Sequence, residues 1–155
     1  MAKVKAIPEG YHSVTPYLYI KGAAKAIEFY AKAFGAKERV RMDGPDGSIG
    51  HAEIEVGDSV IMLADAPDRA ADARNGVTSS IVLYVEDADS VFKRAMGAGA
   101  SEVQPMEDKF YGDRMGTVKD PFGHEWSIGT HIEDVTPEEM KRRMAALPPM
   151  QPQPA

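Results

Sequence analysis

An imidazole and a carboxylate two positions apart, His51 and Glu53, are the first pair in this sequence with an evident chemical use. Residues 51–56 alternate polar and apolar side chains, which is typical of a strand with one buried face. Both side chains should therefore project from one face, opposite Ala52 and Ile54. A histidine beside carboxylates can act as a general acid or base, or help to bind a divalent metal. A solvated polar strand face is the alternative interpretation.

A second group of candidates occupies the run from Tyr111 to Arg114. The similarity between the two halves of the chain aligns Asp113 with His51. Tyr111 and Arg114 offer a ring face and a planar fork of donors, which suits a planar or anionic ligand. Alternatively, Arg114 pairs with Asp113 and closes a loop. The expected catalytic set is His51, Glu53 and Asp113.

Three tyrosines, Tyr17, Tyr19 and Tyr84, share the strand parity that should point them into one pocket. An aromatic pocket would suit a planar drug or metabolite, although a dimer interface would also bury such side chains. The full set of expected ligand contacts is Tyr17, Tyr19, Met62, Tyr84, Tyr111 and Arg114.

The composition narrows the classes of function. The chain has 155 residues, enough for one domain, and a formal net charge of −6. An acidic body disfavours nucleic acid and anionic membrane surfaces as partners. The chain has no cysteine, which excludes disulfides, thiolate nucleophiles and cysteine-based metal sites. No apolar run is long enough to span a bilayer, so we expect a cytoplasmic protein.

The elements that must position these side chains form two similar halves. Each half reads as a strand, a helix and three further strands, as expected for a βαβββ unit duplicated once. In the first half, the strands are expected at 14–20, 38–42, 51–56 and 59–64, and the helix at 23–34. In the second half, a strand at 78–85 precedes a helix that Asp87 caps and that runs through Met96.

The C-terminal segment has a different character. Thr136, Pro137 and Glu139 form a capping box that should begin a short helix through Ala146. The spacing predicts a buried stripe on that helix, made of Met140, Met144 and Leu147. Residues 148–155 are rich in Pro and Gln and are expected to be a disordered tail.

Several strings, among them GHAEIEVGDSVIMLADA and DPFGHEWSIGTHIEDVTPEEM, closely resemble the vicinal oxygen chelate superfamily, in particular its PhnB-like branch of glyoxalase and bleomycin-resistance-type proteins. The resemblance implies an α+β fold in which two βαβββ modules form a cupped mixed β-sheet with the helices on the outer face. It also implies a homodimer. We expect one domain over 11–132, with modules at about 11–66 and 77–132, followed by a C-terminal helix within 133–147.

The same resemblance locates the metal-ligand positions of the metal-dependent relatives, in the first and last strands of each module. Hydroxyls and a thioether at these positions are poor ligands for a divalent transition metal. No cofactor is therefore expected at this site, although a divalent metal at a non-standard site with His51, Glu53 and Asp113 stays open. The four positions are Thr15, Met62, Ser80 and Ser127.

These observations predict a small-molecule-binding protein of the glyoxalase and bleomycin-resistance type, which holds a planar or oxyanionic ligand in an aromatic cup without metal at the usual site. Whether it is an enzyme stays open. The first alternative is a lyase or isomerase of the glyoxalase type that uses a metal or His51 as acid or base. The second alternative is a structural or regulatory dimer.

Overall fold

The computed structural model describes residues 6, 7, 9–68, 70 and 79–147. The strand, helix and three-strand order occurs twice, as the sequence predicts, and a third helix follows. The elements are β1 (Tyr17–Ile20), α1 (Ala23–Phe34), β2 (Lys37–Asp43), β3 (Ile49–Val56), β4 (Ser59–Asp65), β5 (Ile81–Tyr84), α2 (Ala88–Ala98), β6 (Ser101–Asp108), β7 (Asp113–Lys119), β8 (Glu125–His131) and α3 (Pro137–Ala145). No helix in these described ranges is long and apolar enough to cross a membrane.

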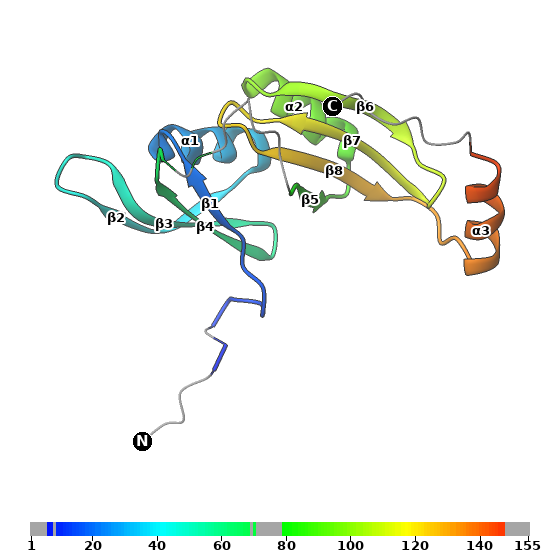
Figure 1. Ribbon diagram of the computed structural model, residues 1–155, viewed down its shortest axis with the longest axis horizontal. Coiled ribbons are helices and arrows are strands. Elements are labelled where there is room, and N and C mark those ends of the chain that lie inside the picture. The colour runs from blue at the N-terminus through cyan, green and yellow to red at the C-terminus, as the bar shows by residue number, and fades with distance from the viewer. Residues whose placement is uncertain (1–5, 8, 69, 71–78, 148–155) are drawn as a thin grey trace.

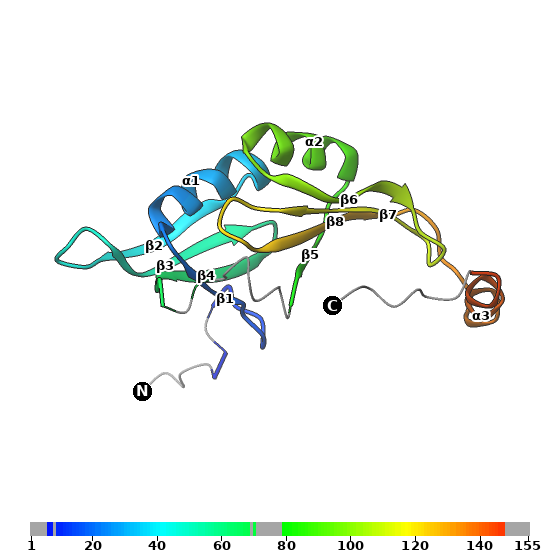
Figure 2. The ribbon, with the colours of Figure 1, turned by 45° about the horizontal axis from the view of Figure 1, so that its top comes forward.

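The strands form two four-stranded mixed sheets. The first sheet has the order β1-β4-β3-β2 and the second the order β5-β8-β7-β6. In each, the first strand pairs in parallel with the last, and the other neighbours are antiparallel. Helices α1 and α2 pack against each other and cover the same side of the two sheets (Figures 1 and 2). The opposite face of each sheet is thereby left for the candidate site.

The two modules use the same device to begin their helices. In the first module the Asp65 carboxylate, at the end of β4, accepts hydrogen bonds of 2.9 Å from the backbone N–H groups of Gly22 and Ala23. In the second, the Thr130 hydroxyl on β8 accepts one from Ala88. Each fourth strand therefore supplies an acceptor for N–H groups at the start of the helix, and in α2 the N-cap Asp87 also accepts the Ser90 N–H, as the sequence predicts.

The core is continuous between the modules. Trp126 is completely buried and packs against Tyr30 and Phe34 of α1. Asp120, 3% exposed, accepts hydrogen bonds from the Tyr30 hydroxyl (2.7 Å) and the Trp126 indole N–H (3.0 Å). The same carboxylate accepts two backbone N–H groups of its own turn, those of Phe122 and His124. One buried carboxylate thus joins a helix of the first module to a strand of the second.

Some element boundaries differ from the sequence expectations. Strand β1 begins at Tyr17 rather than Val14, because Pro16 has no N–H to donate to a ladder. The Pro16 carbonyl still accepts the Met62 N–H, and Val14 is 84% exposed. Helix α2 continues past Met96 to Ala98, and Gly99 is its C-cap. Part of the strand predicted at 78–85 and the tail predicted at 148–155 lie outside the described residues.

Helix α3 begins as predicted, with the Thr136 hydroxyl accepting the Glu139 N–H. The prediction of a buried stripe on this helix is wrong. Helix α3 has no buried residue, and Met144 and Leu147 are exposed. Arg143 holds the helix, donating to the Phe110 carbonyl and to two carboxylates, so polar contacts replace the expected apolar packing.

Candidate functional site

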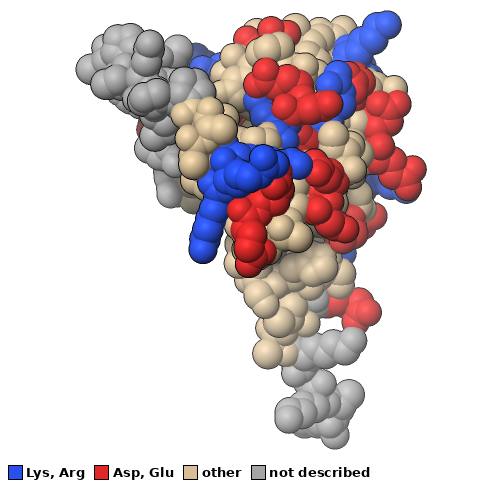
Figure 3. Space-filling view, turned by 90° about the vertical axis from the view of Figure 1, so that its right-hand side faces the viewer, with Lys and Arg blue, Asp and Glu red and all other residues tan. Residues whose placement is uncertain are grey.

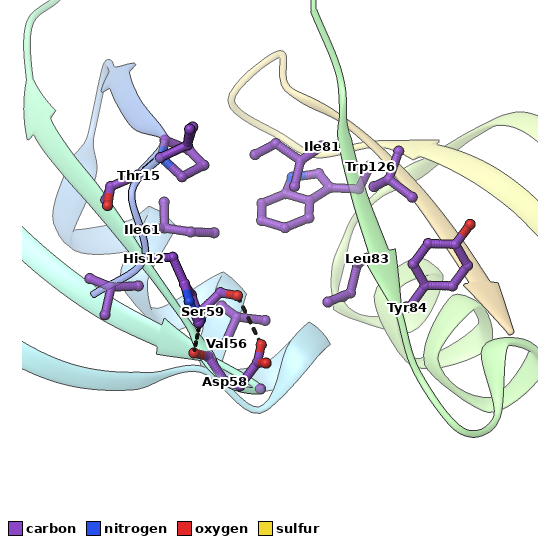
Figure 4. A pocket seen from close by; sticks show the side chains of 15 residues that line it. His12, Thr15, Val56, Asp58, Ser59, Ile61, Ile81, Leu83, Tyr84 and Trp126 are labelled. Carbon is purple, nitrogen blue, oxygen red and sulfur yellow. Dashed lines mark hydrogen bonds between the residues drawn. The ribbon is translucent and has the colours of Figure 1, made fainter. Parts of the chain in front are cut away.

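A cavity of about 410 Å³ lies between the facing edges of the two modules (Figure 4). The segment before β1 and the β3–β4 turn form one wall, and strand β5 with Trp126 forms the other. The side chains that line it are mainly apolar, and Val60, Ile61, Ile81, Val82 and Leu83 are among them. Protein sites for small organic molecules have this size and character.

Few polar side chains reach this cavity. Nε2 of His12 lies 3.2 Å from the Asp58 carbonyl oxygen, and the Ser59 hydroxyl donates to the Asp58 carboxylate (2.9 Å). Tyr84 is a lining residue from the second sheet, and its hydroxyl is bonded to Asp113. Among the described lining residues there is no lysine or arginine, so the walls offer shape and ring surface rather than positive charge.

A second cavity, of about 490 Å³, lies on the first sheet beside the first. Met62, one of the expected ligand contacts, forms part of its wall together with Tyr11 and Ile7. His12 and Thr15 line both cavities. The segment before β1 therefore separates two neighbouring hollows.

His51 and Glu53 project from the same face of β3, as the alternation predicts. Nδ1 of His51 is 3.0 Å from the Tyr17 hydroxyl, and Nε2 is 3.4 Å from a Glu53 carboxylate oxygen. Tyr11 also donates a hydrogen bond to Glu53, which is the largest influence that lowers the pKa of this carboxyl group; burial opposes it. The ring of Tyr17 lies 5.3 Å from that of Tyr19. These groups form one connected polar and aromatic cluster on the face opposite α1.

Asp113 belongs to a different cluster, on the second sheet. Its carboxylate accepts the Tyr84 hydroxyl at 2.6 Å and lies 2.7 Å from Nδ1 of His131. Nε2 of His131 lies 2.8 Å from Asp134. Hydrogen bonds to Asp134, first, and to Asp113 raise the pKa of His131, and the bond to Asp113 raises the pKa of Tyr84. Asp113 thus orients a tyrosine that lines the first cavity.

The raised pKa of His131 gives a testable pH dependence. The unfolded chain should have the ordinary value of 6.5, so protonated His131 stabilises the fold fully below that pH and loses this effect as the pH rises through the folded pKa. We expect His131→Gln to lower the thermal midpoint at pH 5.5 and to change it much less at pH 9. Calorimetric scans of both proteins across this range provide the measurement. An equal difference at both pH values would contradict the assignment.

The expected equivalence of Asp113 and His51 is wrong. The strand registers superpose Leu18 on Leu83 and place Met115, not Asp113, at the position of His51. The reason is that Gly50 lies inside β3, whereas Gly112, with a φ of 98°, forms the turn before β7. The structure therefore brings His51 to Glu53 but leaves Asp113 with Tyr84 and His131.

The remaining expected contacts lie elsewhere. The Arg114 guanidinium binds Asp89 of α2 at 2.6 and 2.8 Å and Asp108 at 3.0 Å, on the helix side of the second sheet. It does not pair with Asp113, which was the alternative. The Tyr111 hydroxyl lies 3.6 Å from the Met115 sulfur, outside the walls of both cavities.

Basic and acidic side chains also alternate on the surface that carries α3 (Figure 3).

The donors at the metal positions of the family do not fit a transition metal. Register places Met62 opposite Tyr17 and Ser127 opposite Val82, which are equivalent places in the two modules. The Ser127 hydroxyl is hydrogen-bonded to Thr117 at 2.9 Å. Neutral hydroxyls and a thioether leave the charge of a divalent ion uncompensated. Across the described ranges, no three histidine or carboxylate side chains converge in a way that could hold a metal ion, which includes the non-standard set with Asp113.

His12 and the turn at Gly57–Ser59 are parts of a cavity wall that the sequence does not predict. Nothing local in the sequence marks His12, because its partner Asp58 is 46 residues away. Ile81 and Leu83 carried only a strand signal. Trp126 packs in the core and also lines the cavity.

Comparisons with known proteins agree with this architecture. The sequence profile of the Glyoxalase/Bleomycin resistance protein/Dioxygenase superfamily matches residues 10–128. Two uncharacterized proteins, from Mycobacterium bovis and Mycobacterium tuberculosis, are each 38% identical over 141 residues, which is 86% of this chain and 93% and 83% of theirs.

Solved structures share the fold. TioX from a Micromonospora species is 27% identical, with a TM-score of 0.63 over 78% of this chain and 99% of that chain. The PhnB protein from Bacillus cereus is 17% identical, with a TM-score of 0.63 over 77% of this chain and 99% of that chain. The chain therefore belongs to the glyoxalase, bleomycin resistance protein and dioxygenase superfamily, with PhnB-like proteins among its structural neighbours.

Proposed function

We propose that this protein binds a small, planar and largely apolar organic molecule in the cavity between its two modules. The observation that carries the proposal is the wall of that cavity, in which branched aliphatic side chains, Trp126 and Tyr84 surround about 410 Å³. Planar molecules gain contact area and ring stacking in such a site, and a few polar groups fix their orientation.

The charges in the site favour a planar ligand over an oxyanionic one. Among the described residues that line the cavity, Asp58 carries a negative charge, which would repel an anion. Arg114, the cation expected to clamp an anion, is engaged by Asp89 and Asp108. His12 and Ser59 remain as polar groups that can meet a carbonyl or amine on the ligand.

The geometry supports catalysis by His51 less well. Both ring nitrogens already face partners, the Tyr17 hydroxyl and Glu53. A general base needs a nitrogen within hydrogen-bond reach of a substrate proton. We therefore consider ligand binding better supported than a lyase or isomerase reaction.

The binding proposal can be tested with N-phenyl-1-naphthylamine, a neutral aromatic dye that contains a planar naphthalene ring. Trp126 is the single tryptophan of the chain and lines the cavity, so dye in the cavity should quench its fluorescence in a saturable manner. We expect Val82→Asp to weaken dye binding at least tenfold, because it places a charge in the apolar wall.

Val103→Asp is the matched control. Val103 is also a half-exposed valine on a strand of the second sheet, 44% exposed against 53% for Val82, but it lies outside the cavity wall. Its dye affinity should equal that of the wild type. Failure of the wild type to bind dye or any member of a panel of planar aromatics would overturn the proposal and favour the structural alternative. An equal loss of dye affinity in the two variants would mean that the dye binds outside this cavity.

A further inference from the structure

Three side chains on the open face of the first sheet form a chain of hydrogen bonds that runs from solvent inward. The Tyr17 hydroxyl lies 3.0 Å from Nδ1 of His51, and Nε2 of the same ring lies 3.4 Å from a Glu53 carboxylate oxygen. Tyr17 is 39% exposed, whereas the side chains of His51 and Glu53 are 26% and 13% exposed. The phenol is thus the member of this chain that a molecule in solution meets first.

The Glu53 carboxylate decides which nitrogen of the imidazole carries the hydrogen. The hydrogen bond from Tyr11, first, holds the pKa of Glu53 below its ordinary value, so Glu53 accepts hydrogen bonds and does not donate one. In the neutral ring of His51, Nε2 therefore carries the hydrogen that faces Glu53, and Nδ1 accepts the hydrogen of Tyr17. A nucleophile within hydrogen-bond reach of a base that a third group orients is the arrangement found in catalytic triads.

Other tyrosine hydroxyls have partners that oppose their ionisation. Those of Tyr11 and Tyr84 donate to the carboxylates of Glu53 and Asp113, and each of these bonds raises the pKa of its phenol. The partner of Tyr17 is an imidazole, which is neutral before a proton transfer and can accept the proton. The Tyr17 hydroxyl therefore has a base beside it, and this phenol, rather than the occupied imidazole, is the group available to a substrate.

The second cavity lies beside this group and is open to solvent. Strand register pairs Met62 with Tyr17 on one side and with Glu53 on the other, so these residues form one row across the sheet. Met62 is also part of the cavity wall, together with Ile7 and Tyr11. The apolar part of a small molecule can thus occupy this hollow and hold a reactive group near Tyr17.

We propose that Tyr17 is a nucleophile that takes the acyl group of a small aryl ester, with His51 as its base and Glu53 as the residue that positions His51. The Tyr17 proton passes to Nδ1 of His51 as the phenolic oxygen bonds to the carbonyl carbon. The bond from that carbon to the aryl oxygen then breaks, the aryl oxide leaves with the electron pair, and the imidazolium returns the proton to it. This acyl transfer goes beyond ligand binding in the first cavity and does not rest on it, because none of the three residues lines that cavity.

The ester p-nitrophenyl acetate is the probe for this reaction. We expect acetylation of Tyr17, which mass spectrometry of proteolytic peptides locates and follows with time. Tyr84 is an internal reference in the same sample, because it is more exposed, at 59%, but its hydroxyl is bonded to Asp113. Tyr17 should be acetylated faster than Tyr84 in the wild type. An equal or slower reaction at Tyr17 would overturn the proposal without any variant.

His51→Gln removes the base and keeps a polar side chain at this position. Acetylation of Tyr17 should become slower by about tenfold or more, whereas acetylation of Tyr84 should not change. His131→Gln is the matched control, since it replaces a histidine that also contacts carboxylates but lies on the second sheet. Its Tyr17 should react at the wild-type rate. Unchanged acetylation of Tyr17 in His51→Gln would overturn the proposal, as would a decrease that Tyr84 or His131→Gln shares.

Glu53→Gln tests the positioning role of the carboxylate. An amide can donate as well as accept, so it no longer requires Nε2 of His51 to carry the hydrogen. The rate of acetylation at Tyr17 should therefore fall between those of the wild type and His51→Gln, with the rate at Tyr84 unchanged. A wild-type rate at Tyr17 would contradict this role of Glu53.

Discussion

Replacing Asp120 with alanine is expected to lower the free energy of unfolding by about 3–5 kcal/mol. The carboxylate is buried and accepts four hydrogen bonds, from the Tyr30 hydroxyl, the Trp126 indole and two backbone N–H groups. Alanine leaves the two buried donors, the Tyr30 hydroxyl and the Trp126 indole N–H, without their acceptor, and it also removes the two part-buried bonds to the turn. Urea unfolding followed by far-ultraviolet circular dichroism measures the loss without depending on Trp126.

Tyr30→Phe is the matched control for this prediction. It removes one of the four donors and keeps the ring in place, so it should cost only about 1 kcal/mol. A loss below about 1 kcal/mol in Asp120→Ala would show that the carboxylate does not hold the core together.

The position of Asp120 links stability to the proposed site. Tyr30 belongs to the first module and Trp126 to the second, and Trp126 is part of the cavity wall. A change at Asp120 should therefore loosen the junction between the modules as well as the core. Variants at Asp120 are expected to lose affinity for planar ligands together with stability.

Most of the fold could be predicted from the sequence because its signals are local. The period of two in β3, the helical spacing before Gly35 and the capping box at Thr136 each depend on neighbouring residues. The repetition of this pattern in the two halves then predicts the order of strands and helix within each module. The stripe on α3 shows the limit of such signals, because an apolar spacing of Met140 and Met144 identifies a face but does not supply anything to cover it.

The site could be predicted only in part, because it depends on contacts between distant segments. Parity correctly placed His51 beside Glu53 and directed Tyr84 away from α2. The alignment of the two halves failed at Asp113, since a glycine within a strand and a glycine in a turn look alike in a sequence. The cavity wall at His12 exists because the chain before β1 returns to the β3–β4 turn, and no local pattern encodes that return.

Asp65→Ala is expected to lower the free energy of unfolding by about 2–3 kcal/mol at pH 7. The Asp65 carboxylate accepts the N–H groups of Gly22 and Ala23 at the start of α1 and that of Ile49 at the start of β3, each at 2.9 Å. It therefore fastens a helix and a neighbouring strand to the end of β4. Thr130→Val, which removes the corresponding cap in the second module, should cost about 1 kcal/mol, because that hydroxyl accepts a single N–H.

The loss in Asp65→Ala should also depend on pH. Burial by itself would raise the pKa of Asp65, but the three backbone N–H groups outweigh it and hold the pKa below its ordinary value of 3.8. A carboxyl group whose folded pKa is depressed stabilises the fold above the unfolded pKa, and this effect disappears as the pH falls through the folded pKa. The difference between wild type and Asp65→Ala in urea unfolding should thus be constant from pH 7 to pH 5 and shrink below pH 4. A difference that grew on acidification would mean that the carboxylate is strained by burial rather than stabilised by its three donors.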